Sequence, residues 1–98
     1  MERDRVLHIL RANRRQLQRD FAVKTLALFG SVARAEATTR SDVDLLVEFS
    51  RPIGLLHLIR TEQYLESLLG VEQVDLILRR AVLPELKDQI YAEALDAI

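Results

Sequence analysis

The sequence predicts an α/β (α+β) fold, a small mixed β-sheet of about three strands covered by helices in the order α-β-α-β-α-β-α. Short apolar runs of strand length alternate with longer stretches that have helical periodicity. With 98 residues, 49% of them hydrophobic, the chain can bury a core, and we expect residues 1–98 to form a single domain. No internal repeat, linker or low-complexity tract interrupts this pattern.

The first element is an amphipathic helix over residues 2–20. Val6, Leu10, Asn13 and Leu17 share one stripe of it, and arginines occupy the rest. Residues 1–20 hold six Arg against three Asp or Glu, a local excess of +3. We interpret this excess as a solvated helix face, although a patch for phosphates or for an acidic partner stays open.

Three short runs predict the strands, namely Lys24–Phe29, Val43–Phe49 and Gln73–Leu78. In the second, alternation places Val43, Leu45, Val47 and Phe49 on one face and Asp44, Leu46 and Glu48 on the other. A crossover through the following helix allows the second and third strands to run parallel. The first and second strands have a short connection, which favours an antiparallel pair.

The connections follow from turn and cap residues. We expect a helical turn at Ser31–Ala37, a loop at Thr38–Ser41 and a turn at Ser50–Gly54. A helix spans Leu55–Leu69 with Gly70 as its C-cap, and Pro84 opens a last helix that runs to the C-terminus. This last helix has a wide apolar band, which either caps the sheet or contacts a partner protein.

Composition excludes several classes of protein. A net charge of -1 argues against a nucleic-acid binder held mainly by phosphate neutralisation. The absence of cysteine excludes disulfides and thiolate zinc sites, and His8 and His57 each stand alone. No apolar run approaches the length of a membrane span, and the N-terminus is too charged for a signal peptide, so we expect a cytoplasmic protein.

A glycine-serine turn offers a site for phosphate. Gly30 falls where a strand gives way to a helix, and glycine there permits positive φ and a close approach of a ligand to the backbone. Ser31 adds a hydroxyl beside the free N–H groups of the helix start. Ser31 could also be only an N-cap, and the two roles are compatible.

Three aspartates predict a metal site. Asp42 and Asp44 are two residues apart at the start of a strand, so both carboxylates can share one hard cation. Asp75 lies inside an apolar strand, where a carboxylate is costly unless it is paired or bound to metal. Asp42 alone could merely satisfy backbone N–H groups in a turn. Asp44 and Asp75 are harder to explain in that way, because both interrupt strands.

This pattern resembles the nucleotidyltransferase superfamily that includes DNA polymerase β, and within it the minimal nucleotidyltransferase (MNT) group. The matching residues are Gly30, Ser31, Arg34, Ser41, Asp42, Asp44 and Asp75. The resemblance runs from the strand before Gly30 through Pro84 and the last helix. Many relatives have glycine where this chain has Ala35. We expect this difference to be minor, because Ala35 lies between the glycine-serine turn and the aspartate pair and is not a ligand.

The resemblance implies a nucleotidyltransferase fold and a Mg²⁺-dependent enzyme. Asp42, Asp44 and Asp75 would be the catalytic residues and would hold two Mg²⁺ ions. Gly30 and Ser31 would bind the phosphates of a nucleoside triphosphate, with ATP as the expected substrate. Arg34 would either reach the triphosphate as well or pair with a nearby acid.

The resemblance also implies a partner, a helical HEPN-type toxin, with this chain as its antitoxin. Some relatives transfer AMP to a tyrosine hydroxyl of that partner. The alternatives are a non-catalytic antitoxin that acts by occlusion, nucleotide addition to RNA or to a small molecule, and a small domain whose acids are only solvated. We expect neither a membrane nor a nucleic-acid partner, and the choice between monomer and homo-oligomer stays open.

Overall fold

The computed structural model describes residues 2–35 and 42–98, and the predicted loop at Thr38–Ser41 lies outside these ranges. The elements run in the order α1 (Arg3–Ala12), α2 (Arg14–Phe21), β1 (Val23–Phe29), α3 (Gly30–Ala33), β2 (Val43–Phe49), α4 (Leu55–Leu69), β3 (Val74–Leu78), the short 3₁₀ helix η1 (Arg79–Ala81), α5 (Pro84–Glu93) and β4 (Leu95–Asp96). Within these ranges, every helix is too short or too polar to cross a bilayer.

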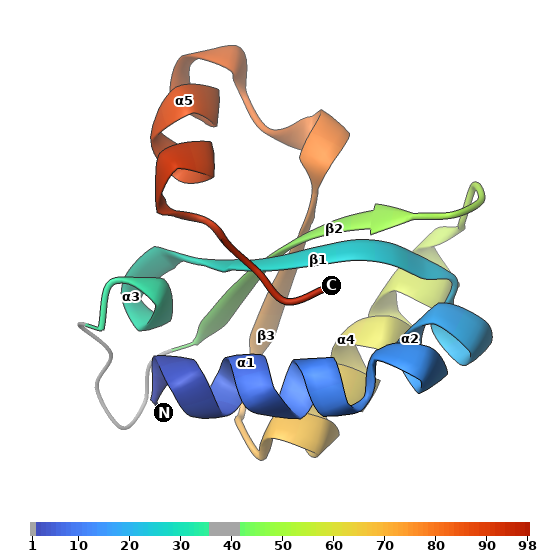
Figure 1. Cartoon of the computed structure of the whole chain (residues 1–98). Coiled ribbons are helices and arrows are strands. Elements are labelled where there is room, and N and C mark those ends of the chain that lie inside the picture. The colour runs from blue at the N-terminus through green and yellow to red at the C-terminus, as the bar shows by residue number, and fades with distance from the viewer. Residues whose placement is uncertain (1, 36–41) are drawn as a thin grey trace.

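The sheet is mixed, with the strand order β3-β2-β1-β4. Figure 1 labels its first three strands, β1, β2 and β3. As predicted, β1 and β2 are antiparallel, and β2 and β3 are parallel and joined through α4. The predicted α/β class is therefore confirmed. The strand number is wrong by one, because the chain forms a fourth, two-residue strand at its C-terminal end.

Strand β4 replaces the end of the predicted last helix. Helix α5 stops at Glu93, Ala94 is extended, and β4 pairs antiparallel with β1. The backbone N–H groups of Ala97 and Ile98 both donate to the carbonyl of Leu26, at 2.8 and 3.0 Å. These hydrogen bonds give a partner to a backbone carbonyl on the outer edge of β1. A helix continued to the C-terminus would not form them.

Helices α1, α2 and α4 cover one face of the sheet (Figure 1). The predicted stripe is confirmed, since Val6, Leu10 and Leu17 are fully buried. The prediction of a single helix over residues 2–20 is wrong, because the helix is interrupted at Asn13 and forms two helices, α1 and α2. The Asn13 side-chain amide donates to the carbonyl of Ile9 at 2.8 Å, a local bond that competes with helix continuation.

Helix α5 lies on the opposite side of the sheet and stands apart from it (Figure 1). None of its residues is buried, and Leu86 is 44% exposed. Its described connections to the rest of the chain are mostly polar: Glu93 pairs with Arg34, and the Tyr91 hydroxyl lies 3.5 Å from the carbonyl of Arg79. The apolar band of this helix therefore caps the sheet only loosely.

Strand β3 is held in place from its outer side by α4. The backbone N–H of Val74 donates to Glu66 at 3.0 Å, and the N–H of Leu76 donates to Glu62 at 3.3 Å. Glu62 and Glu66 are one helical turn apart, which matches the two-residue repeat of N–H groups along one edge of a strand. These bonds fix the strand that carries Asp75.

Candidate functional site

The acidic residues meet where β1 ends and where β2 and β3 begin. The cross-strand register places Phe29 opposite Asp44, and Asp44 beside Asp75. Gly30 follows Phe29 directly, so it lies against Asp44 from the β1 side. The register thus brings Gly30, Asp44 and Asp75 together, as the sequence predicts.

Gly30 is in close contact with the Asp44 carboxylate. Its φ of +77° lies in the left-handed region, which favours glycine. A Cβ atom at this position would overlap Oδ2 of Asp44 and would lie 3.1 Å from its Cγ. The positive φ predicted for Gly30 is therefore confirmed. Its close neighbour here is a carboxylate of the protein itself, and the predicted approach of a ligand to this backbone stays a prediction.

The environment of Asp44 disfavours the charged form of its carboxyl group relative to water. Burial is the largest cause, followed by the charge of Asp75, a side-chain hydrogen bond with Asp75 and the charge of Asp42, and together they raise the pKa of Asp44 to about 6. The charge of Arg34 opposes this shift of the pKa. Asp42, Asp75 and Arg34 therefore all act electrostatically on Asp44, as groups of a single site do.

Two further residues position this site, and sequence reasoning missed both. The side-chain amide of Gln73 donates to Oδ1 of Asp75 at 2.9 Å. Arg34 Nη1 lies 3.0 Å from Oε2 of Glu93, which connects α3 to α5. Of the two roles considered for Arg34, the structure shows the pairing with an acid, and phosphate binding stays a prediction.

The remaining predicted residues lie around this centre. Asp42 is exposed and immediately precedes β2. Ser31 is half-buried as the second residue of α3, and the N-cap of that helix is Phe29, so the N-cap interpretation of Ser31 is wrong. Ser41 lies outside the described residues. The phosphate-binding roles of Gly30 and Ser31 stay predictions.

Position 35 has a backbone conformation that glycine would adopt at lower cost. Ala35 has a φ of 59°, in the left-handed region. An alanine there costs roughly 1 kcal/mol relative to a right-handed conformation. The expectation that alanine in place of glycine is a minor difference is therefore corrected. The left-handed backbone gives glycine a conformational advantage at this position.

The donor chemistry fits a hard divalent cation. Asp42, Asp44 and Asp75 supply only carboxylate oxygens, which Mg²⁺ prefers. Over the described ranges, no three acidic or histidine side chains are placed to hold an ion, and Asp44 and Asp75 instead share a hydrogen bond. A cation would replace the shared proton and relieve the repulsion between the two carboxylates. The metal role of the three aspartates stays a prediction.

Binding of a divalent cation should depend on pH through Asp44. Its pKa of about 6 means that the carboxylate form dominates above pH 6 and the protonated form below it. Because Mg²⁺ binds only the carboxylate, we expect its affinity at pH 5 to be about tenfold lower than at pH 7.5. Calorimetric titration with Mg²⁺ at both pH values measures this, and equal affinities would contradict the shifted pKa.

Comparisons with known proteins agree with this geometry. The family described as "Nucleotidyltransferase domain" matches residues 10–96. The protein adenylyltransferase MntA of Thermococcus cleftensis is 43% identical over 74 residues, which cover 76% of this chain and 74% of that protein. MJ0126 of Methanocaldococcus jannaschii, provisionally named a protein adenylyltransferase, is 43% identical over 77 residues, covering 79% and 78%.

Solved structures share the fold. One that is provisionally described as a minimal nucleotidyltransferase has a TM-score of 0.78 and 38% identity, and the match covers 97% of this chain and 95% of that one. A toxin–antitoxin complex with AMP-PNP has a TM-score of 0.72 and 23% identity, covering 90% and 72%, a likeness that shows the fold alone. The chain is therefore an enzyme of the nucleotidyltransferase domain family and belongs, within it, to the minimal nucleotidyltransferases.

Proposed function

We propose that this protein transfers AMP from ATP to a tyrosine hydroxyl of a helical HEPN-type toxin and so acts as its antitoxin. The observation that carries this proposal is the position of Asp44, in contact with Gly30 on one side and hydrogen-bonded to Asp75 on the other. Such a carboxylate pair is suited to hold a cation against a triphosphate.

Each residue of the site has a role in the proposal. Asp42, Asp44 and Asp75 would hold two Mg²⁺ ions. When bound, the metal would neutralise the triphosphate charge and lower the pKa of the acceptor hydroxyl. The backbone at Gly30 and the Ser31 hydroxyl would steady the phosphates. Arg34, already oriented by Glu93, would add positive charge on the same side.

The proposed reaction is an in-line displacement at the α-phosphorus of ATP. A bond forms between the tyrosine oxygen and the α-phosphorus, and the bond from the α-phosphorus to the bridging oxygen of the β-phosphate breaks. Pyrophosphate leaves with the electron pair, and the hydroxyl proton passes to solvent. Positioning and charge neutralisation account for most of the rate gain in such a reaction.

The relatives support this choice of nucleotide and partner. MntA of T. cleftensis is named a protein adenylyltransferase at 43% identity, and MJ0126 is provisionally named likewise. A structural neighbour is a toxin–antitoxin complex bound to AMP-PNP, an ATP analogue. From these names we infer ATP rather than another nucleoside triphosphate, and a protein rather than a small molecule as acceptor.

Transfer of label tests the proposal. The chain is mixed with Mg²⁺, labelled ATP and its proposed HEPN-type partner, and we expect label on a tyrosine of that protein. Asp75→Asn should abolish the transfer. Asp88→Asn is the matched control, because Asp88 is an exposed carboxylate on α5, outside both the acidic site and the pocket, and should leave transfer unchanged. Lack of label with a folded partner would refute the proposal.

The second candidate, a non-catalytic antitoxin, is favoured by the exposed leucines at positions 55, 56, 83 and 86. These side chains suit a protein that acts by forming a complex. The two candidate functions differ in whether neutralisation of the toxin requires the carboxylates of the acidic site. If Asp75→Asn still neutralises the toxin in cells, then occlusion rather than transfer explains the antitoxin activity.

A further inference from the structure

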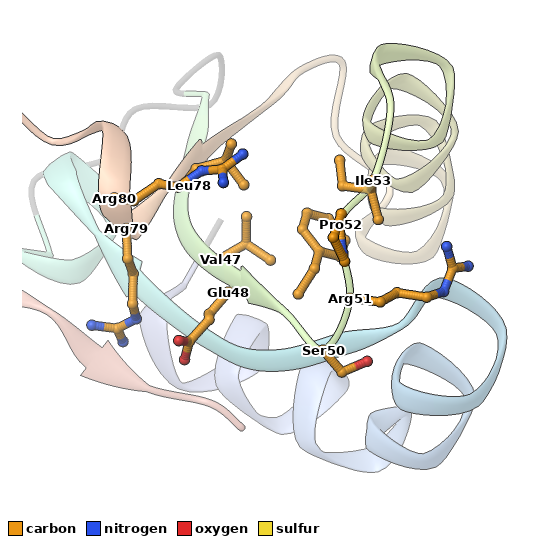
Figure 2. Close-up of a pocket in the computed structure, with 10 residues that line it drawn as sticks. Val47, Glu48, Ser50, Arg51, Pro52, Ile53, Leu78, Arg79 and Arg80 are labelled. Atoms are coloured by element: carbon orange, nitrogen blue, oxygen red, sulfur yellow. The ribbon is translucent and has the colours of Figure 1, made fainter.

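A pocket lies away from the acidic site, at the other end of β2. It has a volume of about 360 Å³ and is formed by the end of β2, the loop after it, the end of β3 and η1. Figure 2 shows Pro52 and Ile53 on one side of the hollow and Val47 and Leu78 on the other. Asp44 and Phe49, the last residue of β2, are five residues apart, a separation of about 17 Å along the strand.

An exposed apolar stripe continues from this pocket onto α4. Ile53 lines the pocket, and two residues later α4 begins with Leu55 and Leu56, which are 71% and 70% exposed. Ile59 is 39% exposed and lies one turn further along the same side of the helix. We call the pocket together with Leu55, Leu56 and Ile59 the α4 surface. Three large exposed side chains in one turn indicate an interaction site.

The rim of the α4 surface is positively charged. Arg51 and Arg80 line the pocket and are exposed, and Arg60 is exposed on α4; Glu48 is the one acidic residue among those that line the pocket. Residues 49–61 contain two arginines and neither aspartate nor glutamate. The first turn of α4 also has no acidic residue, so its partial positive charge adds to that of the arginines. The ligand of this surface should therefore carry negative charge around an apolar centre.

We infer that the α4 surface is the docking site for an acidic amphipathic helix of the HEPN-type partner. The inference rests on the proposed function for the identity of the partner. A helix presents apolar side chains at i, i+3 and i+4, which would contact the leucines and insert one large side chain into the pocket. Acidic residues that flank this stripe would meet Arg51, Arg60 and Arg80.

This arrangement separates the site that holds the partner from the site that modifies it. The two ends of β2 are about 17 Å apart, which corresponds to about three turns of an α-helix. A partner that docks on the α4 surface can therefore present a tyrosine at the acidic site from a segment about three turns away. Docking would raise the local concentration of that hydroxyl without contributing to the chemical step.

Substitution of the leucines tests the docking site. Leu56→Asp should weaken binding of the HEPN protein at least tenfold, as measured by calorimetry, because it places a carboxylate in an apolar contact beside a positive rim. Leu83→Asp is the matched control, at an exposed leucine that forms the N-cap of α5 and is 56% exposed, against 70% for Leu56, and it should bind the partner as the wild type does. Both variants should bind Mg²⁺-ATP normally, since neither residue is near the acids.

Reversal of a rim charge provides the second measurement. Arg60→Glu should lower the association rate severalfold and flatten its dependence on salt, whereas Arg14→Glu on α2 should change neither. Failure of the wild type to bind the HEPN protein would overturn the proposed function. Normal binding by Leu56→Asp would overturn the docking site alone. A wild-type dimer that becomes monomeric in Leu56→Asp, with partner binding retained, would also overturn it and assign the surface to a second copy of the chain.

Discussion

Asp44→Asn should reduce nucleotidyl transfer by roughly a thousandfold, which corresponds to about 4 kcal/mol of transition-state stabilisation. Asparagine keeps the shape of the side chain and can still donate a hydrogen bond to Asp75, so the fold should persist. What it removes is the negative charge at the centre of the site. Transfer of labelled AMP under saturating Mg²⁺ measures the loss, and more than a tenth of wild-type activity would exclude Asp44 as a metal ligand.

The same variant should be more stable than the wild type when metal is absent. The pKa of Asp44 is raised from 3.8 to about 6 in the folded protein, so the folded state binds more protons than the unfolded state between these values. Stability therefore falls as pH rises through this window, and the loss is complete above pH 6.

Substitution by asparagine removes this loss of stability, because the asparagine side chain does not ionise. At pH 8 we expect a gain on the order of 1 kcal/mol, a figure reduced for the partial exposure of the side chain, and thus a Tm higher by about 4–8 °C. At pH 3 the gain should almost vanish, because Asp44 is then largely protonated in both states. Thermal unfolding with a chelator at both pH values measures the difference. A variant that is less stable than the wild type at pH 8 would contradict the raised pKa of Asp44.

Gly30→Ala should impair both activity and folding. The added Cβ would overlap the Asp44 carboxylate, and the φ of +77° disfavours any side chain. We expect a loss of stability of about 2–3 kcal/mol, from the left-handed backbone and from the overlap together. Transfer should fall about a hundredfold, because the carboxylate must move away from its position beside Asp75.

Gly70→Ala is the matched control for this substitution. Gly70 has a φ of +69°, but an added Cβ would meet no atom within 4 Å. This variant should lose only about 1 kcal/mol, from the backbone conformation, and should keep full transfer activity. Chemical denaturation and the labelling assay compare the two. Equal losses of stability and activity in both variants would show that contact with Asp44 is unimportant.

Much of the fold could be predicted because local patterns determine it. Alternation along β2 separates the core residues Val43, Leu45 and Val47 from Asp44 on the other face, and this separation is observed. The end of the chain was not predictable in the same way. Leu95 and Ile98 fit a helical stripe as well as they fit an extended segment, and only pairing with β1 decides between them.

The site was predictable to the extent that its residues lie close in sequence or on strands. The meeting of Gly30, Asp44 and Asp75 follows from the strand order and the parallel crossover, and both could be inferred. Gln73 could have been found as well, because it precedes Asp75 by two residues on the same strand face. Glu93 could not, because its ion pair with Arg34 joins residues that are 59 positions apart.

The bonds from Glu62 and Glu66 to β3 have a consequence for how molecules of this protein meet one another. An outer strand with free N–H groups is a template on which a neighbouring chain can add a strand. In β3 two of these groups are already occupied by the protein's own carboxylates, whose charge also repels an approaching backbone carbonyl. Asp75 can therefore lie on an edge strand of the sheet while that strand is protected from edge-to-edge aggregation.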